Sequence, residues 1–425
     1  MFGKMAALFQ SSLIFRLRRM MSQIWAKVTA YSLLSVVTAL AAIWLGPFIP
    51  SDLAFRIGAD AAEAILNIVA TSMLTVATFS LGIMANAIAG AADSATPRAT
   101  PILLEDRTSQ NVLATFLGAF LFSLVGIIGL KVGVYEDGGR VILFAMTLLV
   151  ILLIFVAFIR WINALRTFGR IPDTLGRIEQ AVEDALERRL AHPYLDCHPL
   201  KELPDTAQLL PICAARSGFV QHIDIHELQA LAEAHDMWIW INRAPGRYAC
   251  SVRPLAYLQI SEMSEDLAGK LRRCFTLGPM RTFAQDPQFG MIVFAETASR
   301  ALSPAVNDPG TAIDVLRRAM GILLRWQERA DPERLHDRIY MPGLGPGDFL
   351  QDLIRPIARD GAGIVEVQHV LLAVLRDLAL GQPDVFTAPA RAQAREVLAR
   401  AEAALTLDSE KAELRAIVSD LLDEA

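Results

Sequence analysis

Charged residues are scarce in this chain of 425 residues. They make up 20% of it against 53% hydrophobic residues, and the mean hydropathy is positive, at +0.38. Globular domains typically hold about 25% charged residues. This shortage excludes a disordered or fibrous chain and favours a membrane protein. The net charge of −5 gives no support for nucleic-acid binding, and we expect no nucleic-acid partner.

Histidine and cysteine are missing from the first 160 residues, since all seven His and all four Cys follow them. Residues 1–160 carry a net charge of +3, whereas residues 161–425 carry −8. The chain therefore divides into an apolar, slightly basic front and an acidic, mixed rear.

Familiar catalytic signatures are also missing. There is no Gly-x-Ser-x-Gly elbow, phosphate loop, His-Glu-x-x-His or dinucleotide fingerprint. His192, Cys197 and His198 lie close together, but no second pair follows at zinc spacing, so residues 191–213 are interpreted as a linker. We assign no catalytic residue, no metal and no cofactor, and an enzyme is the least supported class.

Four uncharged runs have the length that a bilayer crossing requires. They are Val28 to Ser51, Ala64 to Ala92, Thr108 to Leu130 and Val141 to Ile159, with 24, 29, 23 and 19 residues. About 20 apolar residues span a bilayer as a helix, so each run predicts a transmembrane helix. The first run continues past Ala39-Leu40-Ala41 to Phe48, which favours a membrane helix over a cleaved signal peptide.

Positive charge near the ends of these runs predicts their orientation. Ten Lys and Arg lie on one side: Lys4, Arg16, Arg18, Arg19, Lys27, Arg98, Arg107, Arg160, Arg166 and Arg170. Only Arg56, Lys131 and Arg140 lie on the other. We therefore expect a multi-pass protein of the bacterial cytoplasmic (inner) membrane, with the lipid bilayer as partner and both termini in the cytoplasm.

The second run has a polar face. Its members recur every three or four residues, with an acidic residue near each end: Asp60, Asn67, Thr71, Thr75, Thr78, Gly82, Asn86 and Asp93. At about 100° per residue these positions share one side of a helix. Two interpretations remain open: small and hydroxyl residues that pack against other helices, or a water-lined path that favours cations. No ionisable residue lies mid-membrane, which argues against a proton relay.

The predicted fold is an α-helical membrane protein, with four transmembrane helices followed by a cytoplasmic α/β platform and a C-terminal helical bundle. The expected divisions are a cytoplasmic tail (1–27), a transmembrane domain (28–160), an amphipathic helix with linker (161–213), a small α/β domain (214–277) and a helical domain (278–425). An apolar stripe in the third division predicts either a helix on the domain surface or an oligomer contact. It comprises Leu175, Ile178, Val182, Ala185 and Leu186.

Within the α/β domain we expect a strand at 219–223 and a helix at 225–236 capped by Asp224. A strand at 237–242 should pair with 247–252 as a hairpin, and Ser264 should cap the next helix. His222 and His226 are interpreted as surface histidines. After Thr311 the pattern predicts helices to the end of the chain, near 312–330, 349–358, 363–380, 388–405 and 409–423.

The segment 278–312 is the most distinctive one. Asp-Pro occurs at 286–287 and 308–309, and again at 331–332, which is typical of helix starts. Glu296 and Arg300 are spaced as an i,i+4 pair within an apolar helix. If the helices starting at 287 and 309 converged near Arg281, their N-termini would form an anion site; the alternative is capping alone. The hypothetical ligand-binding residues are Arg281, Gln285, Asp286, Glu296, Arg300, Ser303, Asn307, Asp308 and Thr311.

Several strings resemble a bacterial family of predicted membrane proteins, domain of unknown function 2254. They are Thr96-Pro97-Arg98, Ser217-Gly218-Phe219-Val220-Gln221, Gly278 through Arg281-Thr282 to Gln285-Asp286, and Arg300-Ala301-Leu302-Ser303-Pro304-Ala305-Val306-Asn307-Asp308-Pro309. The resemblance covers nearly the whole chain. It implies an integral membrane protein with an N-terminal helical bundle and a cytoplasmic domain, and it implies no activity.

The function that we expect is an oligomeric channel- or transport-like protein with a cytoplasmic regulatory domain, assembled from copies of this chain. The alternative is a membrane-anchored sensor or scaffold that binds a ligand or partner at residues 278–312.

Overall fold

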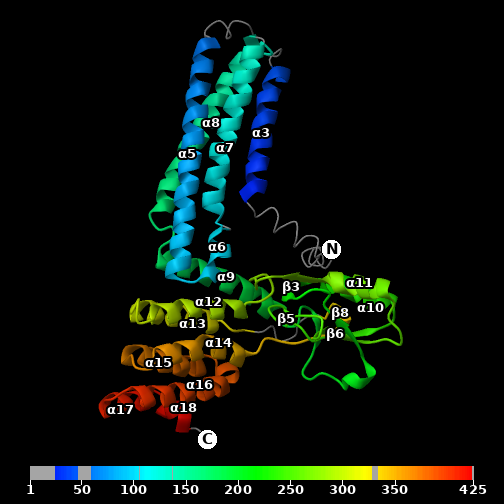
Figure 1. Cartoon of the computed structure of the whole chain (residues 1–425), viewed down its shortest axis with the longest axis vertical. Coiled ribbons are helices and arrows are strands. Elements are labelled where there is room, and N and C mark those ends of the chain that lie inside the picture. The colour runs from blue at the N-terminus through cyan, green and yellow to red at the C-terminus, as the bar shows by residue number, and fades with distance from the viewer. Residues whose placement is uncertain (1–23, 46–58, 105, 136, 328–333, 424–425) are drawn as a thin grey trace. The chain divides into compact units, whose positions relative to one another are not determined.

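The computed structural model describes residues 24–45, 59–104, 106–135, 137–327 and 334–423. They form two compact units (Figure 1). The apolar unit comprises the described residues of Leu17–Asp93 and Thr100–Thr174, and the polar unit comprises Ser94–Ala99 and the described residues of Leu175–Ala425. Each is described by itself.

The apolar unit is a helical bundle. Its helices are α3 (Ile24–Leu45), α5 (Ala59–Ser94), α6 (Thr100–Leu104), α7 (Arg107–Val132) and α8 (Asp137–Leu165). Phe116 of α7 is fully buried and lies in a core with Met73 and Met84 of α5 and Trp161 of α8. Helix α7 therefore provides the surface on which α5 and α8 pack.

Apolar side chains also cover the outside of this unit. Helix α8 exposes ten of them: Leu148, Leu149, Ile151, Leu152, Leu153, Phe155, Val156, Phe158, Ile159 and Ile162. Within the described residues, three helices are long and apolar enough to cross a membrane, at Ala62–Asp93, Thr108–Val132 and Gly138–Leu165. The first predicted span, 28–51, is helical as far as Leu45, and its remainder lies outside the described residues.

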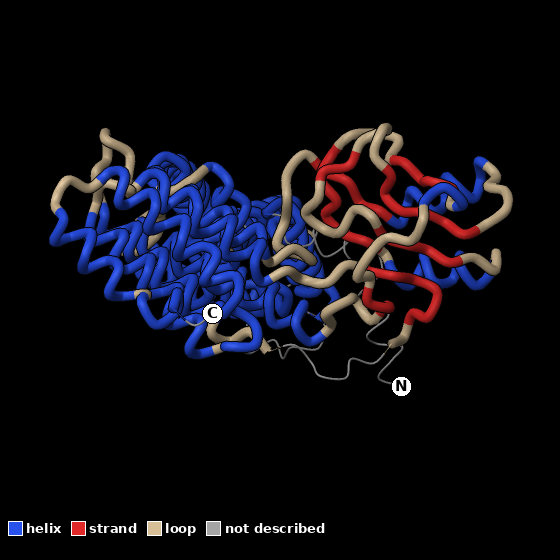
Figure 2. Tube along the Cα trace, turned by 90° about the horizontal axis from the view of Figure 1, so that it is seen from below, coloured by secondary structure: helices blue, strands red, loops and turns tan. Residues whose placement is uncertain are grey.

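The polar unit contains two sheets, which lie together in one part of it (Figure 2). The larger sheet has the order β1-β8-β4-β6-β2, with strands β1 (Cys197–Pro199), β8 (His336–Met341), β4 (Trp238–Ile241), β6 (Pro254–Gln259) and β2 (Leu210–Cys213). Strand β8 runs parallel to β1 and β4, while β6 is antiparallel to β4 and β2. The smaller antiparallel sheet has the order β5-β3-β7, with β5 (Tyr248–Ala249), β3 (Gly218–Ile223) and β7 (Phe275–Gly278).

The two faces of the larger sheet differ. Ile239, Ile241 and Leu258 are fully buried with side chains of α10 (Ile225–Ala234) and α11 (Glu265–Cys274). The opposite face carries rings: Trp240 stacks on Tyr340 with centroids 5.5 Å apart and planes at 3°. The sheet thus has one buried apolar face and one half-buried aromatic face.

Strands β1 and β2 of the larger sheet lie within residues 191–213, so these residues are not a linker. Two further expectations about the strands are wrong. Residues 247–252 do not pair with β4, because β5 joins β3 in the other sheet and β6 is the antiparallel partner of β4. Residues 336–341 form a strand instead of belonging to an all-helical region, because β1 and β4 each leave an edge that β8 fills. Both outcomes depend on pairings between segments far apart in the chain.

Helices form the rest of the polar unit. They are α9 (Ile171–Ala191), which starts in the apolar unit, α12 (Gln288–Ala301), α13 (Pro309–Leu323), α14 (Pro346–Asp360), α15 (Val365–Gly381), α16 (Pro383–Ala404), α17 (Asp408–Ile417) and α18 (Ser419–Asp423). Short 3-10 turns occur at Pro97–Ala99 and Thr206–Gln208. Trp326 is fully buried between Phe349 and Phe386, with edge-to-face contacts at centroid distances of 5.0 and 5.7 Å.

Local helix-start predictions are confirmed. Asp224, Ser264 and Asp308 accept hydrogen bonds from the backbone N–H groups of Glu227, Leu267 and Thr311, at 3.2, 3.2 and 3.1 Å. Pro309 occupies the first turn of α13, as its missing N–H allows. The Asp-Pro pair at 331–332 lies outside the described residues.

The apolar stripe of α9 is buried within the polar unit, with all five side chains at most 3% exposed. Val182 of this stripe lies directly over Gly290 of α12, where an added Cβ would overlap it. Glycine at position 290 therefore sets how closely α9 and α12 approach.

We predict that Gly290→Ala destabilises the protein. Overpacking strain of about 1–3 kcal/mol exceeds the gain in helix propensity of about 1 kcal/mol. The matched control is Gly321→Ala in α13, where an added Cβ meets open space and stability should rise slightly. Thermal unfolding of the purified chain measures both, and equal midpoints for the two variants would contradict the close approach.

Candidate functional site

Helix α5 has two faces of opposite character. Its buried face is mainly apolar: Leu66, Val69, Met73, Ala77 and Met84 are at most 9% exposed, and Ser80 is buried on the same side. Its exposed face carries the predicted polar residues: Asn67, Thr71, Thr75, Thr78, Gly82, Asn86 and Asp93. At about 100° per residue the two sets are centred about 180° apart, so the polar face points away from the bundle core.

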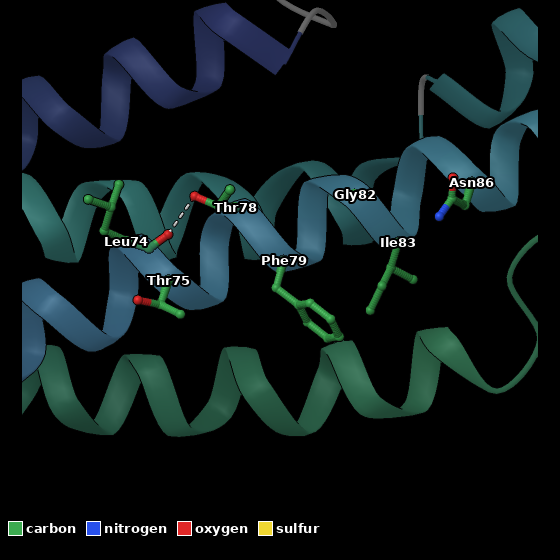
Figure 3. Close-up of a pocket in the computed structure, with 7 residues that line it drawn as sticks. All are labelled: Leu74, Thr75, Thr78, Phe79, Gly82, Ile83 and Asn86. Carbon is green, nitrogen blue, oxygen red and sulfur yellow. Dashed lines mark hydrogen bonds between the residues drawn. The ribbon is translucent and has the colours of Figure 1, made fainter.

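The threonine hydroxyls of this face donate to their own helix. Thr71, Thr75 and Thr78 each bond the carbonyl four residues earlier, at 2.8, 2.9 and 2.8 Å. A hydroxyl that donates its proton keeps lone pairs on its oxygen. These oxygens are therefore acceptors on the exposed face, together with the amide of Asn86 (Figure 3).

A groove of about 690 Å³ opens on the same face. Its lining residues are Leu74, Thr75, Thr78, Phe79, Gly82, Ile83 and Asn86 (Figure 3). A Cβ built at Gly82 or Gly90 would meet nothing within 4 Å, so the surface beside both glycines is open. None of the described residues of the apolar unit fills this face of α5.

The two ends of the polar face differ in charge. Asp93 is exposed. Near the other end Glu63 is neutralised by Lys131, with Oε1 and Nζ 2.6 Å apart. The side chain of Asp60 lies outside the described residues.

At the start of α12, Arg281 and Asp286 pair with each other. The guanidinium donates two hydrogen bonds to the carboxylate, at 2.7 and 2.8 Å, and the Asp286 side chain is 4% exposed. Burial raises the pKa of Asp286, and the hydrogen bonds from Arg281 oppose that rise. Gly246, with φ of 86°, lies so close that any side chain there would overlap Asp286. This pair is built into the packing between the sheet region and the helices.

Gln285 also connects the start of α12 to the sheet region. Its side-chain oxygen accepts from the N–H of Ile223 at 2.9 Å, and its amide donates to the Ile223 carbonyl at 3.3 Å. It therefore continues the pairing of β3 with a side chain and attaches the start of α12 to the smaller sheet.

The remaining residues of the 278–312 set lie at the other end of α12. The Asp308 N–H bonds the Ala301 carbonyl at 2.8 Å, so α13 starts where α12 ends. Ser303 donates to the Arg300 carbonyl at 2.7 Å, and Asn307 has a left-handed φ of 51°. With 14 residues at about 1.5 Å each, α12 separates the two helix starts by about 20 Å, so they do not converge.

Glu296 lies on α12 between the residues at the start of this helix and those at its end, and it bonds to neither set. Its carboxylate accepts from Thr96 Oγ1 at 2.9 Å and from the Arg98 guanidinium. Among the ion pairs of the described residues none joins Glu296 to Arg300, which is exposed, so the expected i,i+4 pair is not formed. Sequence reasoning missed this contact because 198 residues separate Arg98 from Glu296; the only signal was the family-like string Thr96-Pro97-Arg98.

A metal centre is not formed anywhere in the described part of the chain, where no three His, Cys, Asp or Glu side chains are grouped to hold an ion. The expectation that His222 lies on the surface is wrong, because it is 4% exposed on β3. His226 is exposed, on the first turn of α10. Five of the six residues of β3 are buried, on both sides of the strand, so the alternation that suggested a surface position does not apply.

A family model described as a predicted membrane protein, DUF2254, matches residues 21–377. The chain belongs to the DUF2254 family. Uncharacterised proteins of Mycobacterium tuberculosis strain H37Rv and Mycobacterium bovis strain AF2122/97 are 28% identical to it over 292 residues. The match covers 64% of this chain and 54% of each relative, so the chain spans about half the length of these relatives. No solved structure matches.

The DUF2254 match includes α5, α12 and the sheets, and it ends before α16. It supports a membrane protein with apolar helices and carries no activity with it. The exposed polar face of α5 is therefore the feature of this DUF2254 chain that most needs a functional explanation.

Acid should destabilise the polar unit through His222. Burial lowers its pKa from 6.5 to about 4, against the opposing charge of Asp224. The neutral imidazole is thus favoured in the folded state, and its contribution is complete above pH 6.5 and is lost as the pH falls towards 4. The loss amounts to at most about 3 kcal/mol. His222→Gln should lose less stability than the wild type between pH 7 and 4.5 in chemical unfolding, whereas His226→Gln should follow the wild type; identical pH profiles for all three would contradict it.

Proposed function

We propose that the chain is a subunit of a homo-oligomeric, channel-like protein of the bacterial inner membrane, in which polar faces of α5 from several copies line a cation path. The observation that carries this proposal is the position of that face, opposite the packed side of α5 and open to the surroundings. The polar unit would serve as a cytoplasmic regulatory domain.

In a bilayer the polar face of α5 would lie against hydrocarbon unless another molecule covers it. An uncompensated amide in hydrocarbon is unfavourable by roughly 2–7 kcal/mol, and Asn67 and Asn86 are both exposed. Threonine tolerates lipid better because its hydroxyl bonds its own helix. A second copy, or water between copies, would supply the partners that the asparagines lack in lipid.

The chemistry of the face favours cations. Hydroxyl and amide oxygens can replace part of the hydration shell of an ion, as pore linings do. Asp93 adds an exposed negative charge at one end, where it would raise the local concentration of cations.

We further propose four crossings, by α3, α5, α7 and α8, with both termini in the cytoplasm. The support is the distribution of Lys and Arg, ten near one side and three near the other. The alternative function, a sensor that binds a ligand at 278–312, has less support because Arg281 and Asp286 neutralise each other and the two helix starts are separated by the length of α12.

Thr75→Leu should block flux, because it replaces a mid-face oxygen in the groove with a bulkier apolar side chain. We expect cation flux into liposomes to fall about tenfold, the effect of about 1.4 kcal/mol added to the barrier. The matched control is Thr115→Leu on α7, where the hydroxyl makes the same bond to the carbonyl four residues earlier, at 2.8 Å. The proposal fails if wild-type protein passes no ions, or if the two variants have the same effect.

Asp93→Asn should reduce conductance mainly at low salt. The loss should be about two- to fivefold at 10 mM salt, where the Debye length is about 30 Å, and small at 1 M, where it is about 3 Å. Single-channel conductance in planar bilayers at the two salt concentrations measures this. A reduction that is independent of salt would show that Asp93 acts through structure and not through its charge.

A further inference from the structure

We propose that Ser94–Ala99 is a coupling segment, held on α12 by Glu296, through which the polar unit controls the position of α5. This inference rests on the proposed function, since it concerns regulation of the same path. Both sequence neighbours of the segment belong to the apolar unit, yet the segment itself belongs to the polar unit. The chain thus leaves the apolar unit after Asp93, enters the polar unit for six residues and returns at Thr100.

Three side chains of the segment are buried. Ala95, Thr96 and Ala99 are 1%, 3% and 0% exposed. The backbone closes on itself, because the Ala99 N–H bonds the Thr96 carbonyl at 3.0 Å and the Arg98 N–H bonds Thr96 Oγ1 at 3.3 Å. The segment is therefore a compact turn and can transmit a displacement.

Glu296 uses both carboxylate oxygens on this turn. Oε2 accepts from the Thr96 hydroxyl at 2.9 Å, and Oε1 pairs with the Arg98 guanidinium. Nearby side chains of α12 that are apolar and buried include Phe294 and Ala298. Glu296 is thus a charged attachment point next to the buried apolar side chains of α12.

Helix α12 is itself attached to the sheet region and to α9. Asp286 at its start pairs with Arg281, and Gln285 just before it bonds the backbone of β3. Gly290 in its first half lies against Val182 of α9. A shift of α12, caused by any change in the sheet region, would therefore reach the turn at 96–98, and from there the end of α5 that carries Asn86 and Asp93.

The test exchanges the charges of Arg98 and Glu296. Glu296→Arg alone should change cation flux by at least about threefold, the size expected for a half-exposed ion pair with its hydrogen bond. Combining it with Arg98→Glu should return flux to within about twofold of the wild type, because the swapped pair restores the attraction. The matched control is Glu396→Arg in α16. Glu396 pairs with Arg355 and Arg400 and is 29% exposed, against 30% for Glu296, and the change should leave flux unchanged.

Hydrogen exchange of the same variants separates this proposal from the channel itself. In Glu296→Arg, exchange of the amides of residues 86–93 should accelerate at least about threefold and return in the double variant. If wild-type protein passes no ions but exchange follows this pattern, the channel fails and the coupling stands. If exchange accelerates only at 94–99, or if the double variant behaves like Glu296→Arg, the coupling is overturned.

Discussion

Met73, Ala77 and Met84 of α5 pack on Phe116 and Trp161, and this contact determines the orientation of the helix about its own axis. With this side of α5 in the core, Thr71, Thr75 and Asn86 face outward, next to exposed apolar side chains such as Ile68 and Phe79. A helix in a bilayer ordinarily does the reverse, with apolar side chains toward lipid. This orientation accounts for the groove beside Thr75 and for the open surface at Gly82.

Helix α12 has a comparable role in the polar unit. Along its length it meets the sheet region through Asp286, α9 through Gly290, the turn at 96–98 through Glu296 and the start of α13 through Ala301. Each contact comes from a different part of the chain. The segment that sequence analysis singled out for ligand binding is thus a junction, where its charged and amide side chains hold elements together.

How much could be predicted from the sequence depended on the range of the interactions involved. Caps such as Asp224 and Asp308 were predictable because the partner N–H lies three residues away. The polar face of α5 was predictable from spacing alone. The partner of Glu296, the burial of His222 and the pairing of β8 were not, because each depends on segments 50 or more residues away along the chain. Spacing also cannot tell which face of a membrane helix packs, so the outward direction of Thr75 needed the structure.

The position of β8 has a consequence for synthesis. Strand β4 lies at 238–241 and its neighbour β8 at 336–341, with α11, α12 and α13 in between. A ribosome adds about 5–20 residues per second, so the edge of β4 waits about 5–20 s for its partner. During that interval the edge of Trp-Ile-Trp-Ile that faces away from β6 is short, apolar and unpaired, the kind of edge that joins other chains. The nascent chain is therefore most prone to aggregation after its membrane helices have been made and before its larger sheet is complete.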